Sequence, residues 1–370
     1  MKLGFPRALT YYDYYPFWAG FFHRLGIDLV TSPLTNRQIM EIGLKKAPDE
    51  TCLPVKILVG HLNALKEVDG IFLPRLVSME ENTYLCPKIL GLPESVLYVV
   101  PPGQAVYTVD VNWREGRRDV LKNLELFGLK IGRSKAQVRE AFVEANQWLQ
   151  TYEHMRSRGW SFEESMECFE NLAEPMKLNK LGFDAKRSNK LKPSEFEDGW
   201  LLDREIEQKS ADEDRPRIAL IGHSYLAYES YANLNLLQRL GEKAELYVVE
   251  NIESKHIEKS QKTLHKKIFW SHAKKIYGAG GTYIDDPKID GLIYLSCFGC
   301  GTDSMTNDLL ARRARAEQKP YMVVTLDEHS GEAGLVTRIE AFLDMLERRM
   351  GNESDVSTYG KLLDRYSSSV

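Results

Sequence analysis

A short apolar motif occurs twice in this chain and limits the folds that the chain can adopt. Val68-Asp-Gly-Ile-Phe-Leu73 in the first half parallels Ile289-Asp-Gly-Leu-Ile-Tyr294 in the second, and cysteine follows both copies, at Cys86 and Cys297. Each copy has the pattern of a buried strand within an alternation of strands and helices, which is typical of a parallel sheet. The sequence therefore predicts an α/β protein with two Rossmann-like parallel-sheet units.

A second internal similarity supports the same interpretation. Tyr12-Asp13 with Tyr15 in the first half matches Tyr228-Glu229 with Tyr231 in the second, and each set lies between an expected strand and an expected helix. Both expected helices end on Leu-Gly, at residues 25–26 and 240–241, where glycine favours the end of a helix. We interpret these parallels as a duplication.

The pattern along the chain divides it into four parts. We expect a first Rossmann-like unit over residues 1–110, a helical insertion with a charged linker over 111–214, a second unit over 215–350 and a polar tail over 351–370. Periodicity predicts strands over residues 2–5, 27–30, 68–73, 217–222, 244–249, 289–295 and 321–326. It predicts helices over residues 11–25, 37–46, 54–65, 113–127, 134–158, 161–178, 231–240, 254–277, 307–316 and 335–350. Gly278-Ala-Gly-Gly281 is expected to break the long helix before it, and Asp303-Ser304 to cap the helix that follows.

Composition and charge narrow the class of protein. The chain has 370 residues and a net charge of −4, so it carries no general surplus of positive charge for nucleic acid or anionic membranes. No run approaches the roughly 18 apolar residues of a membrane helix, and the start lacks the pattern of a secretion signal. Five cysteines in such a chain favour reduced thiols. We therefore expect a cytoplasmic protein that binds neither nucleic acid nor membrane.

The two cysteines of Ser296-Cys-Phe-Gly-Cys-Gly301 are the strongest candidates for a site. Cys297 follows a buried strand and Cys300 precedes a helix, and open α/β sheets bind ligands at this edge. A helix amino terminus also favours thiolate over thiol. A pair with this spacing is compatible with a redox dithiol, half of a zinc site, a metal cluster or two inert thiols.

Two further cysteines strengthen the metal interpretation. If the two units pack face to face, Cys52 and Cys86 would meet Cys297 and Cys300 in one cleft. Four thiolates can hold a zinc ion or a 4Fe–4S cluster. Zinc sites usually contain two local cysteine pairs, whereas only one pair is local here, so we favour iron–sulfur over zinc. Cys168 lies within an expected amphipathic helix and is assigned a structural role.

Several motifs together resemble a known family. They are Gly4-Phe-Pro-Arg-Ala-Leu9, Tyr15-Pro-Phe-Trp18, Asp49-Glu-Thr-Cys-Leu-Pro-Val-Lys56 with Gly60-His61, Tyr84-Leu-Cys-Pro-Lys88 with Gly91-Leu-Pro93, Ser296-Cys-Phe-Gly-Cys-Gly301, Asp327-Glu-His-Ser-Gly-Glu-Ala-Gly334 and Thr337-Arg-Ile-Glu-Ala-Phe-Leu-Asp344. The combination resembles the acyl-CoA dehydratase activase-related proteins, relatives of the 2-hydroxyacyl-CoA dehydratase and benzoyl-CoA reductase subunits. The resemblance covers both α/β units and omits the helical middle.

The resemblance implies a cofactor, partners and an activity. It implies Rossmann-like domains around an Fe–S cluster that receives low-potential electrons from a separate ATP-dependent activase, itself an iron–sulfur protein. By resemblance, Cys52, Cys86, Cys297 and Cys300 are the ligands of the cluster. A homologous larger subunit and a homo- or heterodimeric arrangement are also implied. The expected function is the use of these electrons for reduction or radical dehydration.

The chain departs from its relatives in two respects. It contains no glycine-rich phosphate loop, so ATP hydrolysis is expected on another chain, and its five cysteines are fewer than the six of the double-cubane relatives. Whether the chain is itself an enzyme is left open. The alternatives are a non-catalytic electron relay or scaffold subunit, and a zinc-stabilised structural protein; neither the substrate nor the binding of CoA esters follows from the sequence.

Other polar residues are weaker candidates. His223 and His329 each follow an expected strand, so both lie at the sheet edge of Cys297 and are candidates for proton donation. A hydrogen bond within a turn is the structural alternative for both. His61 is expected to pack near Cys52, and Arg75 could bind an anionic group. The aromatic residues over 11–22 are expected to form core.

Overall fold

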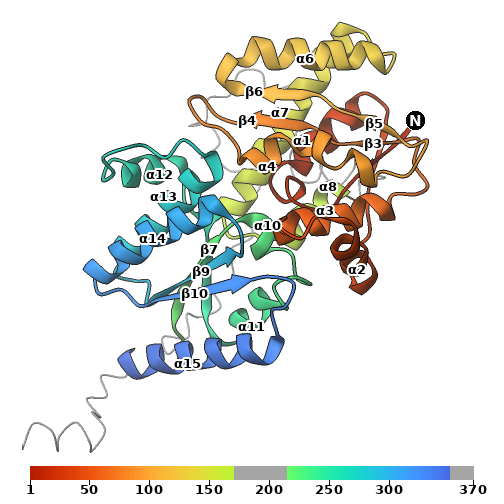
Figure 1. Cartoon of the computed structure of the whole chain (residues 1–370). Helices are drawn as coiled ribbons and strands as arrows, with labels where there is room; N and C mark the ends of the chain where they lie inside the picture. Colours follow the sequence, from red (N-terminus) through yellow and green to blue (C-terminus); the bar gives the residue numbers. More distant parts are fainter. Residues whose placement is uncertain (171–214, 351–370) are drawn as a thin grey trace, which may run out of the picture.

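Strands and helices alternate in both halves of the chain, and the described strands form two four-stranded parallel sheets and one two-stranded parallel pair (Figure 1). The computed structural model describes residues 1–170 and 215–350. The expected charged linker, the boundary at residues 211–214, the end of the helix over 161–178 and the polar tail lie outside the described residues. Within the described ranges, no helix has both the length and the apolarity needed to cross a membrane.

The first half contains six strands and eight α-helices in its described residues. The strands are β1 (Lys2–Phe5), β2 (Asp28–Thr31), β3 (Gly70–Phe72), β4 (Arg75–Ser78), β5 (Ala105–Tyr107) and β6 (Asp110–Asn112). The helices are α1 (Tyr11–Arg24), α2 (Arg37–Lys46), α3 (Leu53–Ala64), α4 (Pro87–Leu90), α5 (Leu92–Ser95), α6 (Arg117–Lys130), α7 (Lys135–Ser157) and α8 (Phe162–Glu170). Short 3₁₀ turns η1 (Leu97–Val99) and η2 (Trp113–Glu115) precede β5 and α6.

The second half has the simpler alternation. Its strands are β7 (Arg217–Gly222), β8 (Glu245–Val248), β9 (Gly291–Cys297) and β10 (Tyr321–Leu326). Its helices are α10 (Ser224–Ala227), α11 (Leu236–Lys243), α12 (Ser254–Gln261), α13 (Ser271–Asp285), α14 (Gly301–Ala316) and α15 (Glu332–Met350), with the 3₁₀ turn η5 (Val249–Asn251).

The two main sheets have the same strand order. The first sheet runs β2-β1-β3-β5 and the second β8-β7-β9-β10, and every pairing in both is parallel. In each, the first strand of the half is central and the second lies at an edge. A separate two-stranded parallel pair, β4 and β6, lies beside the first sheet. The expected α/β class with parallel sheets is therefore confirmed.

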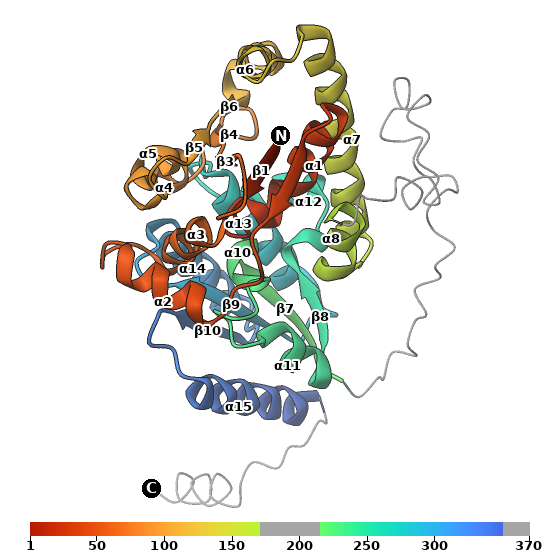
Figure 2. The same ribbon diagram turned by 90° about the vertical axis from the view of Figure 1, so that its right-hand side faces the viewer.

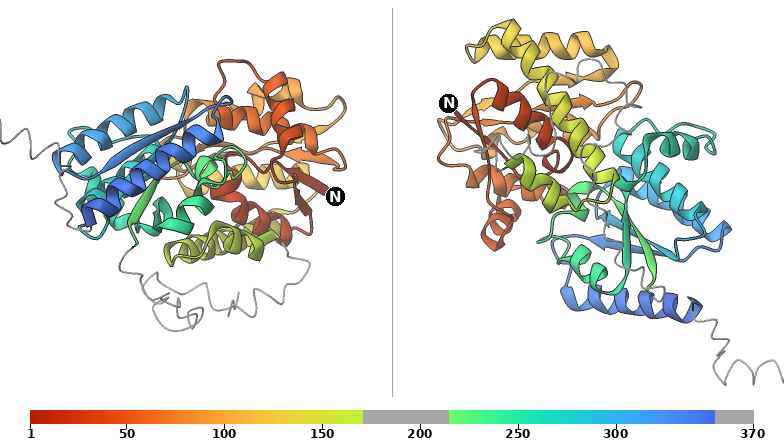
Figure 3. Two further views of the ribbon diagram at one scale, coloured as in Figure 1. Left: turned by 90° about the horizontal axis from the view of Figure 1, so that it is seen from below. Right: turned by 180° about the vertical axis from the view of Figure 1, so that it is seen from behind.

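Helices cover both faces of each sheet. In the first half α1 and α7 pack together on one side, and α2 and α3 lie on the other (Figure 2). The aromatic residues of α1 are core, as expected: Trp18 is 1 % exposed and packs edge-on against Phe72 of β3. In the second half α15 lies across one face of the sheet and α13 and α14 across the other (Figure 1). Helix α7 continues past α1 toward the second half (Figure 3), where Asn251 Nδ2 donates to the carbonyl of Arg156 at 3.0 Å.

The expected helix break at Gly278–Gly281 is wrong. These glycines lie inside α13, and the break comes earlier, between α12 and α13. A Cβ on Gly278 would lie 2.6 Å from Ile257 of α12, and one on Gly280 would lie 2.7 Å from Leu310 of α14. Close packing with the two neighbouring helices therefore outweighs the low helix propensity of glycine.

Two other helix boundaries also differ from expectation. The helix expected over 231–240 begins later, as α11, and continues through Gly241 to Lys243. Helix α14 begins at Gly301 with Cys300 as its N-cap, so Asp303 lies in the first turn and does not cap the helix. Asp303 is 1 % exposed, and its carboxylate binds groups of the preceding strand instead.

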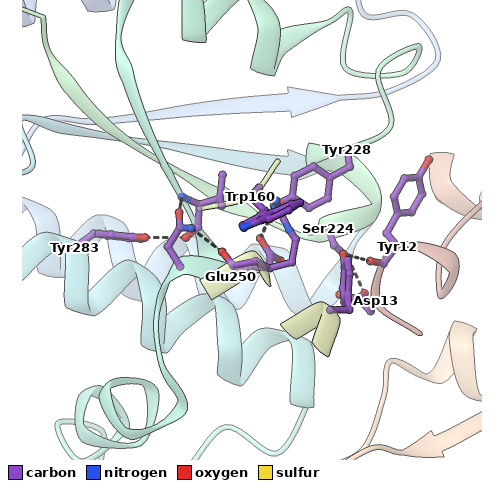
Figure 4. A network of polar contacts seen from close by, with 11 residues as sticks. Tyr12, Asp13, Trp160, Ser224, Tyr228, Glu250 and Tyr283 are labelled. Carbon is purple, nitrogen blue, oxygen red and sulfur yellow. Dashed lines mark hydrogen bonds and ion pairs between the residues drawn. The ribbon is translucent and has the colours of Figure 1, made fainter. Parts of the chain in front are cut away.

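Polar contacts join the two halves at the start of each. Ser224 Oγ of α10 donates to Asp13 Oδ2 of α1 at 2.6 Å (Figure 4), and Tyr12 OH donates to Glu229 Oε2 at 2.6 Å. Glu229 is 3 % exposed and also accepts from Thr35 Oγ1 at 2.7 Å. The segments with internal similarity thus contact each other across the junction.

An ion pair between α3 and the loop after β10 also joins the halves. Lys56 Nζ lies 2.6 Å from Glu328 Oε1, and the Lys56 side chain is only 4 % exposed. The hydrogen bond from Lys56 lowers the pKa of Glu328. A carboxylate with a lowered folded-state pKa stabilises the fold above its ordinary pKa, and this stabilisation is lost as the pH falls.

Replacing Glu328 with Gln should destabilise the protein by about 1–3 kcal/mol at pH 7, because Lys56 remains buried without its anion. The difference between wild type and variant should shrink as the pH falls below about 4.3, the ordinary pKa of Glu. Urea unfolding of both proteins from pH 7 to pH 3.5 measures this difference in the free energy of unfolding. A difference that stays constant over this range would contradict the assignment.

Candidate metal centre

The loop between β9 and α14 positions the local cysteine pair. Cys297 is the last residue of β9, a fully buried central strand, and Cys300 is the N-cap of α14. Gly299 between them has a φ of +77°, which a residue with a Cβ rarely adopts. The chain therefore turns sharply enough to place both thiols beside one helix terminus.

The other two thiols also stand at helix starts. Cys52 is the N-cap of α3 and Cys86 that of α4, and a proline occupies the first turn of each helix. The preference of proline for this turn explains why both helices begin there. Three of the four predicted ligands are thus N-cap residues.

The four thiols lie close enough to influence one another. Burial raises the pKa of Cys52, and Cys300 and Cys86 raise it further. Burial likewise raises the pKa of Cys297, followed by the effect of Cys52. Cysteines from both halves therefore lie in one electrostatic neighbourhood. The thiolate, not the thiol, is the metal ligand, and a bound cation would favour that form.

Backbone amides are directed at two of the sulfurs. The backbone amide of Val55 acts to lower the pKa of Cys52, and that of Leu53 acts to lower the pKa of Cys297, so both amides lie near these sulfurs. Both amides belong to the first turn of α3, where the N–H of Val55 also donates to the carbonyl of Cys52 at 3.0 Å. Amides in this position can donate hydrogen bonds of the kind that tune sulfur ligands in iron–sulfur proteins.

The spacing of the thiols bears on which metal they fit. A tetrahedral zinc site, with Zn–S near 2.3 Å, requires sulfurs about 3.8 Å apart. No three of the described cysteines have sulfurs that all lie within 4.8 Å of one another. The described cysteines therefore do not form a preformed tetrahedral zinc site.

A histidine and a carboxylate adjoin Cys300. A ring nitrogen of His223, Cys300 Sγ and a carboxylate oxygen of Asp303 all lie within 4.8 Å of one another. His223 Nε2 is 3.2 Å from Asp303 Oδ1, and His223 is 3 % exposed. Burial acts to lower the pKa of His223, but Asp303 raises it above the ordinary value. Burial acts to raise the pKa of Cys300, but His223 lowers it below the ordinary value.

Asp303 links the histidine to the cysteine strand. Its Oδ1 accepts from Tyr294 OH at 2.9 Å, and its Oδ2 accepts from the backbone N–H of Cys297 at 3.2 Å. Sequence reasoning assigned Asp303 only to helix capping. The signal that could have revealed its role is an acidic residue one turn after a strand-end cysteine.

The remaining predicted residues lie elsewhere. His329 is exposed, in a turn where Asp327 Oδ1 accepts from its backbone N–H at 2.9 Å. His61 is fully buried and binds the hydroxyls of Ser32 and Thr35 at 2.8 and 2.9 Å; burial lowers its pKa to about 3.

Arg75 and Cys168 each have a contact within the chain. Arg75 forms an ion pair with Glu94, so its charge is matched within the chain. The half-buried Cys168 lies on α8, where its Sγ contacts the carbonyl of Glu164 at 3.4 Å.

A cleft of about 470 Å³ opens next to the thiol site. Met40 and Leu53 line it from the first half, and the segments over 230–239 and 327–332 line it from the second. Leu53 belongs to both places, since its N–H faces Cys297. Leu234 and Asn235 in the cleft wall both have a φ of 58°, an unusual conformation for residues with a Cβ.

The fold and site define an α/β protein whose two parallel sheets bring four thiols together at their junction. A family model described as "CoA enzyme activase uncharacterised domain" matches residues 2–252, more than half of the chain. The chain belongs to this family of activase- and dehydratase-related proteins. A second model, "2-hydroxyglutaryl-CoA dehydratase, D-component", matches residues 200–346. Both matches confirm the resemblance found in the sequence. No match to a curated protein was found.

Proposed function

We propose that this chain binds a 4Fe–4S cluster through Cys52, Cys86, Cys297 and Cys300, and handles low-potential electrons. The observation that carries the proposal is the convergence of these thiols from residues 52 to 300 at one junction. A structural role for the thiols alone would not require helix starts and both halves of the chain to meet there. The absence of three described cysteine sulfurs within 4.8 Å of one another speaks against a preformed site for zinc, the structural alternative.

A bound cluster would supply one-electron transfer at low potential. The chain's own residues would hold it and set its surroundings. The four cysteines would bind iron, the amides of Leu53 and Val55 would donate to sulfur, and burial would limit water. The exposed Phe298, 71 % accessible, lies between two of the ligands, so the site is close to the surface.

The family membership supports the proposed partners and reaction class. The electrons would come from a separate ATP-dependent activase, and they would serve a reduction or a radical dehydration in a 2-hydroxyacyl-CoA dehydratase-like system. A homologous larger subunit, in a heterodimer, or a second copy of this chain would complete the complex. A low-potential cluster of this kind is suited to the reducing cytoplasm.

The common strand order supports the interpretation of two Rossmann-like units as a duplication. Both sheets have the order second, first, third, fourth strand, and the similar segments around Tyr12 and Tyr228 follow the first strand of each. Under this proposal, each unit contributes two of the four ligands.

The test is anaerobic purification with assays of iron and acid-labile sulfide, and an absorption spectrum before and after dithionite. We expect about four irons and four sulfides per chain, with a broad band near roughly 400 nm that bleaches on reduction. A colourless protein containing about one zinc would overturn the proposal.

An electron relay is the second candidate, and the four-thiol set favours it. Four cysteines could ligate all four irons, which would leave none open for a substrate. Adding cyanide to the reduced protein distinguishes the two roles. An unchanged EPR spectrum supports the relay, and a new signal supports an open iron and a catalytic role.

A further inference from the structure

We infer that His223 is a positioning residue for the metal centre: it donates an N–H hydrogen bond to the sulfur of Cys300 and so raises the reduction potential of the bound cluster. The inference rests on the proposed function, because it concerns the cluster that the thiols would hold. It assigns His223 a role other than proton donation to a substrate.

The first observation is an unused hydrogen-bonding capacity. His223 is 3 % exposed, and both of its ring nitrogens are buried without a well-directed hydrogen bond to any described residue. Buried polar atoms of native proteins nearly always have a partner. The sulfur of Cys300 lies within 4.8 Å of a ring nitrogen, so it is the natural acceptor once it is a metal-bound thiolate.

The second observation is that the ring is held in place. It stacks on Tyr225 with centroids 4.6 Å apart and planes 9° apart, and His272 lies edge-on at 5.6 Å. Asp303 Oδ1 lies 3.2 Å from Nε2. These contacts leave the imidazole little freedom to turn away from Cys300.

The third observation is the connection through Asp303. This carboxylate faces His223 and also accepts the backbone N–H of Cys297, while Tyr294 OH fixes its position. One buried carboxylate therefore orients the histidine and anchors the strand end that carries the second cysteine. Such outer partners fix the orientation of ligands and tune the metal.

The hydrogen bond affects the reduction potential through the negative charge on the sulfur. A hydrogen bond to a ligating sulfur withdraws electron density from it, which stabilises the cluster with its added electron. Losing that bond should make reduction harder. Thr302 Oγ1, 3.3 Å from Cys300 Sγ, also contacts this sulfur and would remain in place.

The experiment compares H223F, which keeps the aromatic stack, with H223Q, which keeps a donor, and with H265Q at an exposed position as the control. After anaerobic loading, iron and sulfide are counted and the midpoint potential is measured by EPR-monitored titration. We expect near-normal iron in all three variants, a more negative midpoint in H223F, a smaller shift in H223Q and none in H265Q.

The results that would refute the proposed function differ from those that would refute only the role of His223. A wild-type protein without iron and sulfide refutes the proposed function, whereas equal midpoints in wild type and H223F refute the role of His223 alone. Loss of iron from both H223F and H223Q would make His223 a ligand and overturn the inference. If H223F does not fold, pulsed EPR of ¹⁵N-histidine-labelled wild type and H223Q replaces it. A weak nitrogen coupling in wild type that H223Q lacks supports the hydrogen bond from His223. The absence of this coupling in wild type refutes the hydrogen bond.

Discussion

Replacing Cys300 with Ala should lower the iron content from about four per chain to about one or fewer, because a cluster that loses a thiolate ligand becomes labile. Cys300 lies beside Cys52, His223 and Asp303 at the junction of the two halves. Iron and sulfide assays after anaerobic reconstitution, with circular dichroism to verify folding, measure the effect.

Cys168→Ala is the matched control for this prediction. Cys168 is half-buried on α8, where its Sγ contacts the backbone carbonyl of Glu164, so the iron content of this variant should equal that of wild type. Equal iron losses from both variants would contradict the ligand assignment.

Gly60→Ala should destabilise the protein by about 1–3 kcal/mol and reduce cluster loading. Helices α2 and α3 cross at two glycines: a Cβ on Gly60 would lie 2.1 Å from the carbonyl oxygen of Ile39, and one on Gly43 would lie 2.1 Å from that of Lys56. A backbone atom cannot move aside as a flexible side chain can. The added methyl must therefore separate the helices, and α3 carries Cys52 at its start.

Gly334→Ala serves as the control for the effect of alanine in a helix. Gly334 lies in α15, and a Cβ there would meet no atom within 4 Å. This variant should be neutral or up to about 1 kcal/mol more stable, since alanine favours helices over glycine. Thermal unfolding and iron content are measured for both variants. Similar melting temperatures would refute the packing argument.

Sequence periodicity predicted the elements whose pattern is local. Strands β7 and β10 and helix α2 have the predicted bounds. The glycines of α13 were misjudged because their role depends on α12 and α14, which approach from distant parts of the sequence. A local pattern predicts helix propensity, but it carries no information on the packing between helices that overrides this propensity.

In the candidate site, too, local sequence patterns predicted some features, and contacts between distant segments determine others. The sequence pattern placed Cys297 at a strand end and Cys300 at a helix start, as the structure has them, and the same logic selected His223 and His329 equally. The structure separates the two histidines: one is buried beside Cys300 and the other lies in an exposed turn. The role of Asp303 depends on its contact with His223, which is distant in sequence, and the Lys56–Glu328 pair joins the two halves of the chain.

The division of the thiols between the two halves affects how the protein must be made. Cys300 follows Cys86 by roughly 200 residues, which a ribosome needs about 10–40 seconds to translate at 5–20 residues per second. During that time the first two thiols are present without their partners. Under the proposed function, insertion of a cluster would therefore have to wait until Cys300 has been synthesised and the two halves have met.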